Sequence, residues 1–272
     1  MPARFWPAHA RPIHNYVKTD NMDSNDYIFG IHPALEAIEA GRTIDKLFIK
    51  KDLHGDLAIR LTRTARERGI PVQRVPVERL NRITRKNHQG VIAQIAAVDY
   101  ARLGDIVPTL FEEGVVPFIL VLDGITDVRN FGAIARTAEC CGVNAIVIGT
   151  RGSVSVGADA VKTSAGALLH IPVCREDSLL NAVKYLQSSG CQIVCSTEKA
   201  SENYTLADFT TPVALVMGAE DTGISNEILQ VADTRAAIPM FGHIGSLNVG
   251  VAAGVMMYEV VRQRLKDNME IV

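Results

Sequence analysis

The sequence lacks the features that define several common classes of protein. No stretch approaches the ~20 consecutive apolar residues that a membrane-spanning helix needs, and the apolar segment 249–261 is interrupted by Glu259. The first residues carry no signal-peptide pattern. No G-x-G-x-x-G fingerprint follows a strand and no P-loop lysine motif is present, which disfavours nucleotide-dependent oxidoreductases and cofactors held by a phosphate cradle. We expect no membrane association.

Cysteine is scarce, odd in number and without C-x-x-C pairing. The pattern favours buried, reduced thiols in a cytoplasmic protein over disulfides, and it predicts no metal site. The five cysteines are Cys140, Cys141, Cys174, Cys191 and Cys195.

Net charge is also low, at −2, but it is unevenly divided along the chain. Residues 1–104 carry 17 of the 28 Lys and Arg and 11 of the 30 Asp and Glu, a net of +6, which leaves −8 for the remainder. A basic front half suggests contact with a polyanion such as RNA. Two ordinary solvated surfaces remain the alternative.

The hydrophobic pattern changes near residue 100. Residues 1–26 show no periodicity and read as a flexible tail. Residues 27–100 alternate short strand-like and helical segments, with helices expected at 33–40, 56–68 and 78–84, and predict a small α/β domain. Residues 101–116 are expected to form a linker.

Residues 117–272 contain continuous apolar runs, which are typical of parallel strands covered on both faces. These runs are FILVLD, AIVIG, QIVCS and VALVMG. With helices expected at 131–141, 178–188, 226–232 and 249–267, they predict a doubly wound α/β domain. Gly250 and Gly254 in the last helix suggest close helix packing or a subunit contact rather than a membrane motif.

Ligands of such sheets bind beyond the carboxyl ends of the strands. Three polar or glycine-rich segments lie there, at 130–138, 218–223 and 238–248. Singly, their side chains have ordinary explanations: Asn130 and Asn248 as helix caps, Arg136 paired with Glu139, Glu220 in a solvated turn. Together at one sheet edge they favour a binding site.

The three segments resemble the signature motifs of the SpoU/TrmH branch of the SPOUT RNA methyltransferases. The motifs are NxGxxxRTA at 130–138, LVMGxExxGIS at 215–225 and IPMxGxxxSLNVxVAAG at 238–254. Upstream, three segments look like the small substrate-binding domain of large-subunit ribosomal RNA 2′-O-methyltransferases, a domain similar to ribosomal protein L30e/L7Ae. These segments are YIFGIHPALEAI, KLFIKK and RKNHQGVIA.

The resemblance implies a deep trefoil knot in the rear domain, a homodimer that pairs through the knotted region, and S-adenosylmethionine as cofactor. Gly218, Ile238 and Leu247 match positions that bind this cofactor largely through backbone groups. The implied catalytic residues are Arg136, Asn130, Glu220, Ser246 and Asn248. Because a guanidinium does not give up its proton in proteins, we interpret Arg136 as the group that binds the phosphate beside the target ribose, held in place by Glu220, Ser246 and Asn248, and not as the base.

The front domain offers side chains for RNA. Basic residues recur at three- or four-residue steps and lead into an Asn-His-Gln-Gly segment, whose polar groups suit the base edges of an unpaired loop. A solvated basic face is the alternative. The predicted RNA-binding residues are Arg79, Arg82, Arg85, Lys86, His88 and Gln89.

These features predict methylation of a ribose 2′-hydroxyl, at a guanosine of large-subunit (23S) ribosomal RNA, in the cytoplasm. A transfer-RNA ribose methyltransferase is the alternative within the family. A catalytically silent RNA-binding assembly protein on the same fold is the alternative from another class.

Overall fold

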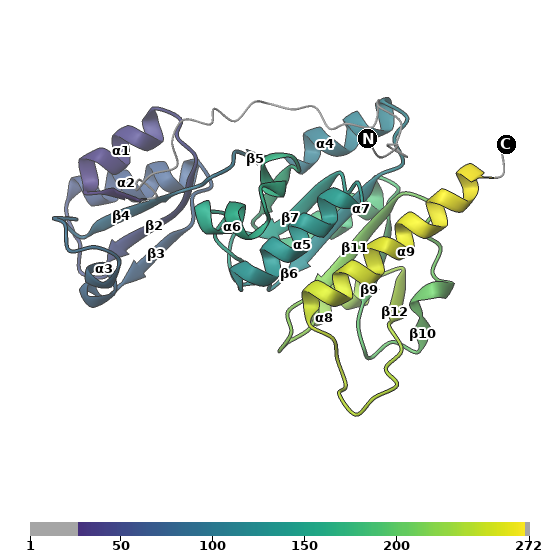
Figure 1. The fold of residues 1–272 in the computed structure, drawn as a ribbon. Coiled ribbons are helices and arrows are strands. Elements are labelled where there is room, and N and C mark those ends of the chain that lie inside the picture. The colour runs from purple at the N-terminus through teal and green to yellow at the C-terminus, as the bar shows by residue number, and fades with distance from the viewer. Residues whose placement is uncertain (1–26, 270–272) are drawn as a thin grey trace. The chain divides into compact units, whose positions relative to one another are not determined.

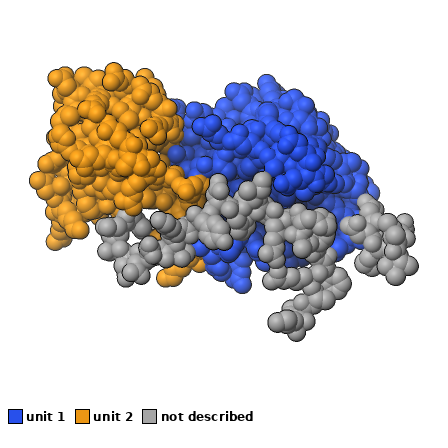
Figure 2. Space-filling view, turned by 90° about the horizontal axis from the view of Figure 1, so that it is seen from above, with its two compact units in different colours: residues 1–16, 100–154, 163–272 blue, residues 17–99, 155–162 orange. Residues whose placement is uncertain are grey.

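The computed structural model describes residues 27–269, which form two compact units (Figures 1 and 2). Within this range the smaller unit comprises residues 27–99 and 155–162, and the larger unit comprises residues 100–154 and 163–269. The tail predicted at residues 1–26 lies outside the described residues.

The smaller unit packs helices on both faces of a four-stranded sheet. The sheet has the order β1-β4-β2-β3, in which only β2 and β3 are parallel neighbours. On β2, Leu47 and Ile49 face the core covered by α1 and α2, whereas Phe48 packs with Leu80 of α3 on the other face. The strands are β1 (Tyr27–Phe29), β2 (Ile44–Lys50), β3 (Val72–Val75) and β4 (Val91–Ile95), and the helices are α1 (Ile31–Glu39), α2 (Asp56–Glu67) and α3 (Val77–Ile83).

The larger unit is built on a parallel sheet of the order β10-β12-β9-β11-β6-β7-β8-β5. The four continuous apolar runs form β6, β7, β9 and β11 at its centre, where helices cover both faces, and this confirms the predicted α/β architecture. The shorter strands β5, β8 and β10 were not predicted, whereas β12 is the strand that was expected before the loop 238–248. The strands are β5 (Tyr100–Ala101), β6 (Phe118–Asp123), β7 (Ala145–Gly149), β8 (Val173–Glu176), β9 (Gln192–Ser196), β10 (Glu202–Asn203), β11 (Val213–Gly218) and β12 (Thr234–Ala237).

Helices α4, α7 and α8 pack on one face of this sheet, and α5 and α9 lie side by side on the other (Figure 1). No helix among the described residues is long and apolar enough to cross a membrane. The helices of the larger unit are α4 (Leu103–Glu112), α5 (Val128–Cys140), α7 (Leu179–Ser188), α8 (Asn226–Val231) and α9 (Val249–Met269), with 3-10 turns η1 (Ala167–Leu169) and η2 (Tyr204–Leu206). Helix α6 (Ala158–Thr163) belongs to the smaller unit except for its last residue.

The segment expected as a linker, 101–116, is structured. It contains α4, whose Leu103, Val107 and Leu110 are buried in the core of the larger unit, so the apolar face of a helix was overlooked there. A return segment, 155–162, joins the smaller unit instead, where the Val156 carbonyl accepts from the backbone N–H of Ala97 at 2.9 Å.

Gly250 and Gly254 lie on the face of α9 that packs against α5. A methyl group on Gly250 would lie 3.6 Å from Cβ of Ala133, and one on Gly254 would lie 3.9 Å from Thr137, both on α5 and both at ordinary contact distance. The tightest neighbour of a methyl group on Gly250 is the capping Oδ1 of Asn248, at 3.1 Å. The pair therefore lies at a helix-packing contact, as the sequence suggested, but the contact does not require glycine.

Arg264 fastens the far part of α9 to the body of the larger unit. Its guanidinium donates to the carbonyl oxygens of Val116, Pro117, Phe209 and Thr211 at 2.9–3.0 Å. Burial lowers the pKa of Arg264 to about 10, which still leaves it charged at neutral pH. One side chain thus satisfies carbonyl groups from two segments that are far apart in the sequence.

We expect Arg264→Ala to lower the free energy of unfolding by about 2–4 kcal/mol, because several carbonyl groups would lose a charged donor at once. Arg264→Lys should recover only part of this, since an ammonium lacks the planar fork. Chemical denaturation measures both. The control Arg102→Ala, at an exposed position, should stay within about 0.5 kcal/mol of wild type, and an equally small change for Arg264→Ala would contradict the assignment.

Candidate active site

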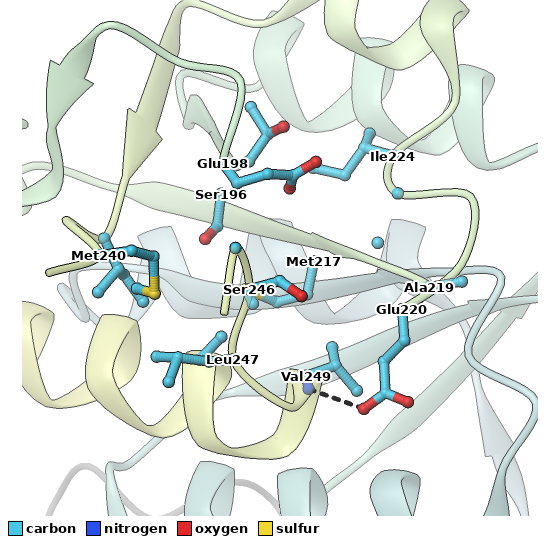
Figure 3. Close-up of a pocket in the computed structure, with 16 residues that line it drawn as sticks. Ser196, Glu198, Met217, Ala219, Glu220, Ile224, Met240, Ser246, Leu247 and Val249 are labelled. Atoms are coloured by element: carbon cyan, nitrogen blue, oxygen red, sulfur yellow. Dashed lines mark hydrogen bonds between the residues drawn. The ribbon is translucent and has the colours of Figure 1, made fainter. Parts of the chain in front are cut away.

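A pocket lies at the carboxyl ends of β9, β11 and β12, the edge at which ligands of open α/β sheets bind (Figure 3). The space between its lining residues is about 650 Å³, a figure that includes open solvent at the mouth. The structure brings the three predicted cofactor residues, Gly218, Ile238 and Leu247, together in its lining. The other lining residues are Ser196, Thr197, Glu198, Met217, Ala219, Glu220, Gly223, Ile224, Met240, Gly245, Ser246, Val249 and Ala252.

Gly218 ends β11 where the backbone folds back tightly. A methyl group there would lie 2.2 Å from the carbonyl carbon of Gly223 and 2.3 Å from the nitrogen of Ile224, so no side chain fits. The turn is closed by the Gly223 N–H, which donates to the carbonyl of Ala219 at 2.9 Å. The absence of a side chain lets this turn form one wall of the pocket.

Three of the predicted catalytic side chains form one hydrogen-bonded group beside the pocket. The amide nitrogen of Asn248 donates to Oδ1 of Asn130 at 3.0 Å and to Oε1 of Glu220 at 2.5 Å. The same carboxylate oxygen accepts from the backbone N–H of Val249 at 3.1 Å (Figure 3). The group joins α5, the turn after β11 and the start of α9, which are the locations of the three sequence motifs.

Asn248 is also the cap of α9. Its Oδ1 accepts from the backbone N–H groups of Gly250 at 3.0 Å and Val251 at 3.4 Å. Because this oxygen faces backbone donors, the amide nitrogen must face Asn130 and Glu220, which fixes the orientation of the amide. The oxygen of the amide therefore caps α9, while its nitrogen joins Asn130 and Glu220 at the sheet edge. The catalytic role assigned to Asn248 stays a prediction.

Asn130 itself does not cap a helix. Helix α5 begins at Val128, earlier than the predicted residue 131, and Asp127 caps it by accepting from the backbone N–H groups of Arg129 and Asn130 at 2.7 and 2.9 Å. These bonds, that from Asn130 first, lower the pKa of Asp127. The side chain of Asn130 is thereby left for Asn248.

Arg136 stands apart from this group. It is exposed on α5 and makes no hydrogen bond or ion pair with any described residue, including Glu139. Six residues separate it from Asn130, so it points to a different side of the helix. The expectation that Glu220, Ser246 and Asn248 hold Arg136 is therefore not met in this chain. Ser246 lies in the pocket lining, and its side chain is not part of the hydrogen-bonded group.

The predicted RNA-binding side chains lie in the smaller unit, and all but one are exposed. The Arg79 guanidinium and the Lys86 ammonium each lie 5.6 Å from the centre of an aromatic ring, Phe48 and Phe29 respectively. Helix α3 ends at Ile83, so the predicted alignment of basic residues on one helical face stops before Arg85. Arg82, Arg85 and Gln89 are also exposed.

His88 corrects the prediction, because it is buried. Its Nδ1 accepts from the backbone N–H of Gly90 at 3.0 Å, so Nε2 carries the proton and donates to Oδ1 of Asn81 at 2.9 Å. Both ring nitrogens are used within the unit and neither remains for a base edge. His88 shapes the loop that carries Gln89.

Sequence reasoning missed the pocket residues that follow β9. Ser196, Thr197 and Glu198 line the pocket, and the Glu198 side chain extends across it in the direction of Ile224 (Figure 3). Ser196 is the last residue of β9, and Thr197 and Glu198 follow it, so the carboxyl-end rule, applied to all four runs, would have found them.

The cysteines take no part in this site. All five are unpaired, and burial raises the pKa of Cys174 and Cys195 to about 12, so these thiols stay protonated. Among the described residues, no three His, Cys, Asp or Glu side chains are grouped so as to hold a metal ion.

The larger unit thus has a pocket and a hydrogen-bonded amide–carboxylate group at the carboxyl edge of a parallel sheet, and the smaller unit has exposed basic side chains. Residues 117–258 match the SpoU rRNA methylase family, and residues 27–101 match the substrate-binding domain of RNA 2′-O-ribose methyltransferases. The chain belongs to the SpoU (TrmH) family of RNA 2′-O-methyltransferases, enzymes of tRNA or rRNA whose cofactor is S-adenosylmethionine.

Individual relatives agree with this assignment. The chain is 35% identical to YacO of Bacillus subtilis, assigned to the TrmH family of tRNA/rRNA methyltransferases, over 88% of this chain and 96% of YacO. An AdoMet-bound rRNA methyltransferase from Sinorhizobium meliloti superposes with a TM-score of 0.55 at 27% identity, covering 87% of this chain and 86% of that one. The TrmH/SpoU tRNA-modifying enzyme of A. aeolicus has a TM-score of 0.50 at 31% identity, covering 57% of this chain and 78% of that one.

We expect Asn248→Asp to separate the two functions of this side chain. A carboxylate still caps α9, but it cannot donate to Asn130 and it repels Glu220. Thermal stability should stay close to wild type, while methyl transfer to RNA should fall about tenfold or more. Asn248→Ala should lose both cap and activity.

The matched control is Ser178→Ala, which removes the cap of α7 and its bond from the Asn181 N–H at 3.2 Å. It should cost about 1 kcal/mol of stability and leave methyl transfer unchanged. Full activity in Asn248→Asp would mean that the bridge to Asn130 and Glu220 is not needed.

Proposed function

We propose that this protein methylates the ribose 2′-hydroxyl of a guanosine in large-subunit ribosomal RNA, with S-adenosylmethionine as methyl donor. The observation that carries the proposal is the meeting of three motifs at one sheet edge, where Asn248 joins Asn130 to Glu220 beside the pocket. A cofactor pocket and a polar group for the acceptor then lie next to each other.

The pocket residues fit a cofactor held through backbone groups. Gly218 leaves its wall free of a side chain, and the segment from Ile238 to Leu247 offers peptide groups from an exposed loop. Ile238 and Leu247 would supply apolar contacts for the cofactor's adenine ring, and their peptide groups would be available to the ring edge. S-adenosylmethionine, when bound, supplies an electrophilic methyl group on sulfonium.

Arg136 is proposed to bind the phosphate beside the target ribose and to stabilise negative charge that develops on the 2′-oxygen. Its exposure and its lack of a partner among the described residues leave the guanidinium free for RNA. Since arginine keeps its proton, a phosphate oxygen or a water accepts the proton of the hydroxyl. Asn130, Glu220, Ser246 and Asn248 are proposed to orient the reacting ribose.

Ribosomal RNA is favoured over transfer RNA by the smaller unit. The rRNA methyltransferase of S. meliloti matches 87% of the chain, whereas the tRNA-modifying enzyme of A. aeolicus matches 57%. The basic residues of that unit supply a surface for RNA phosphates. A silent RNA-binding protein is disfavoured, because Asn130, Arg136, Glu220, Ser246 and Asn248 are all present and three of them form a bonded group.

We also propose that the protein is a cytoplasmic homodimer and that its larger unit contains a trefoil knot. The order of the sheet supports a knot, because β11 lies between β6 and β9 and the chain then crosses to β12 before α9 returns to pack on α5. Val251 and Tyr258, each 54% exposed and seven residues apart on α9, offer an apolar strip for a second copy.

We expect Arg136→Lys to lower turnover about a hundredfold with unchanged S-adenosylmethionine affinity, because lysine keeps the charge but lacks the planar fork. Single-turnover methylation measures the rate of methyl transfer, and calorimetry measures the affinity for S-adenosylmethionine. Arg66→Lys on the exposed side of α2 is the matched control. Nearly full turnover in Arg136→Lys would refute the role of the fork.

The Arg136→Lys variant also tests which RNA is the substrate in cells. Mapping of 2′-O-methyl groups in a strain that lacks this protein should show one guanosine of large-subunit RNA unmodified. The wild-type gene should restore the methyl group and the Arg136→Lys gene should not. Loss of a methyl group from transfer RNA instead would replace the proposed substrate.

For the dimer, light scattering at micromolar concentration should give twice the chain mass. Tyr258→Glu should shift the protein towards monomer, because it places a charge in the apolar strip. Lys184→Glu on the exposed side of α7 is the control and should remain dimeric. A monomeric wild type would rule out this part of the proposal.

A further inference from the structure

The charged side chains that line the pocket of the larger unit are both carboxylates. Glu198 comes from the turn after β9 and Glu220 from the turn after β11 (Figure 3). Among the described residues, the lining of this pocket contains no Lys, Arg or His. The pocket therefore favours a ligand that carries positive charge.

A second cavity adjoins this pocket and shares one wall with it. The second cavity adds Lys199, Asp221 and Thr222 to that wall and lacks the apolar lining of the first, to which Ile238 and Leu247 belong. Apolar groups of a ligand suit the first cavity, and charged groups suit the shared wall and the second cavity. The six residues of the shared wall are Glu198, Ala219, Glu220, Gly223, Gly245 and Ser246.

The two carboxylates of the shared wall differ in their surroundings. Oε1 of Glu220 accepts from the amide of Asn248 and from the backbone N–H of Val249, so this side chain belongs to the hydrogen-bonded group beside the pocket. Glu198 is exposed and makes no hydrogen bond or ion pair with any described residue. Its charge is therefore available to a ligand.

The methyl donor and the product that remains after transfer differ in charge at one atom. S-adenosylmethionine carries a sulfonium, whereas S-adenosylhomocysteine carries a neutral thioether, because the electron pair of the broken S–C bond stays on sulfur. The adenine ring, the ammonium group and the carboxylate are the same in both ligands. A carboxylate of the protein near the sulfur thus attracts the donor more strongly than the product.

We propose that Glu198 is a specificity-determining residue of the pocket, whose carboxylate favours the cationic donor over the neutral product. The proposal rests on the proposed function, since it assigns a role to a further residue of the same pocket. With the adenine ring at Ile238 and Leu247, the sulfur reaches the shared wall, because it links the adenosine to the charged amino-acid end of the ligand.

The expected effect is that of one pair of charges at an exposed site, which corresponds to about fivefold in affinity. When the methyl group leaves, this attraction is lost and the ligand is held less tightly. Glu198 then favours exchange of the product for a new donor.

The test measures the affinity of the full chain for both ligands by calorimetry, at low ionic strength and without RNA. Glu198→Gln should weaken binding of S-adenosylmethionine about fivefold and that of S-adenosylhomocysteine less than twofold, because the amide keeps the shape of the side chain but not its charge. Sinefungin, which carries a protonated amine in place of the sulfonium methyl group, should behave like the donor. Salt at about 1 M should reduce the difference between the ligands.

Glu112→Gln is the matched control. It removes one exposed carboxylate at the end of α4, which precedes β6 and so lies towards the opposite edge of the sheet. Both affinities should stay unchanged in this variant. An equal loss of both ligands in Glu198→Gln would overturn the proposal in favour of a contact with the ammonium group that the ligands share, and no loss of either would also overturn it.

Methyl transfer to RNA distinguishes this proposal from the proposed function. If Glu198→Gln loses the preference for the donor and the wild type methylates no RNA, the role of Glu198 stands and the RNA methyltransferase activity falls. If the wild type methylates RNA and Glu198→Gln keeps the wild-type ratio of the two affinities, the activity stands and the role of Glu198 falls.

Discussion

The larger unit depends on how the first turn of α9 satisfies its backbone N–H groups. A helix start leaves several donors without partners inside the helix. Here two side chains accept from these donors: Glu220 accepts from the N–H of Val249, and Asn248 accepts from the N–H groups of Gly250 and Val251. Because Glu220 belongs to the turn after β11, the start of the helix is fixed to the sheet edge. The amide nitrogen of Asn248 then donates to Asn130 and holds this side chain at the same sheet edge.

The far part of α9 is fixed in a similar way, by side chains of the helix that hydrogen-bond backbone groups of other segments. Arg264 holds carbonyls from the segments before β6 and β11, and Gln263 exchanges hydrogen bonds with backbone groups of Ala207 and Phe209. Both attachments lie on the same helix. The exposed segment 238–248 therefore runs between two fixed elements, β12 and α9. A loop with fixed ends presents its peptide groups to a ligand at little entropic cost.

The division of charge along the chain corresponds to a division of tasks. The basic front half folds into the smaller unit, where exposed arginines and lysines border a loop braced by His88. The acidic rear half folds into the unit that carries the pocket at the carboxyl ends of β9, β11 and β12. The two family matches divide the chain in the same way, with a substrate-binding domain at 27–101 and the SpoU rRNA methylase family at 117–258.

The sequence by itself determined the α/β architecture, most helices and the three motif segments, because apolar periodicity and strand-end loops are local features. The family resemblance also singled out Gly218, Ile238 and Leu247, which the structure brings into the lining of one pocket; that they bind the cofactor stays a prediction. Only the tertiary structure decided that His88 is buried, that Arg136 lies apart from Asn130, and that Asn248 both caps and bridges. Each of these three facts depends on residues that are distant in the sequence and close in the fold. The hydrophobic periodicity of a sequence carries no information about such contacts.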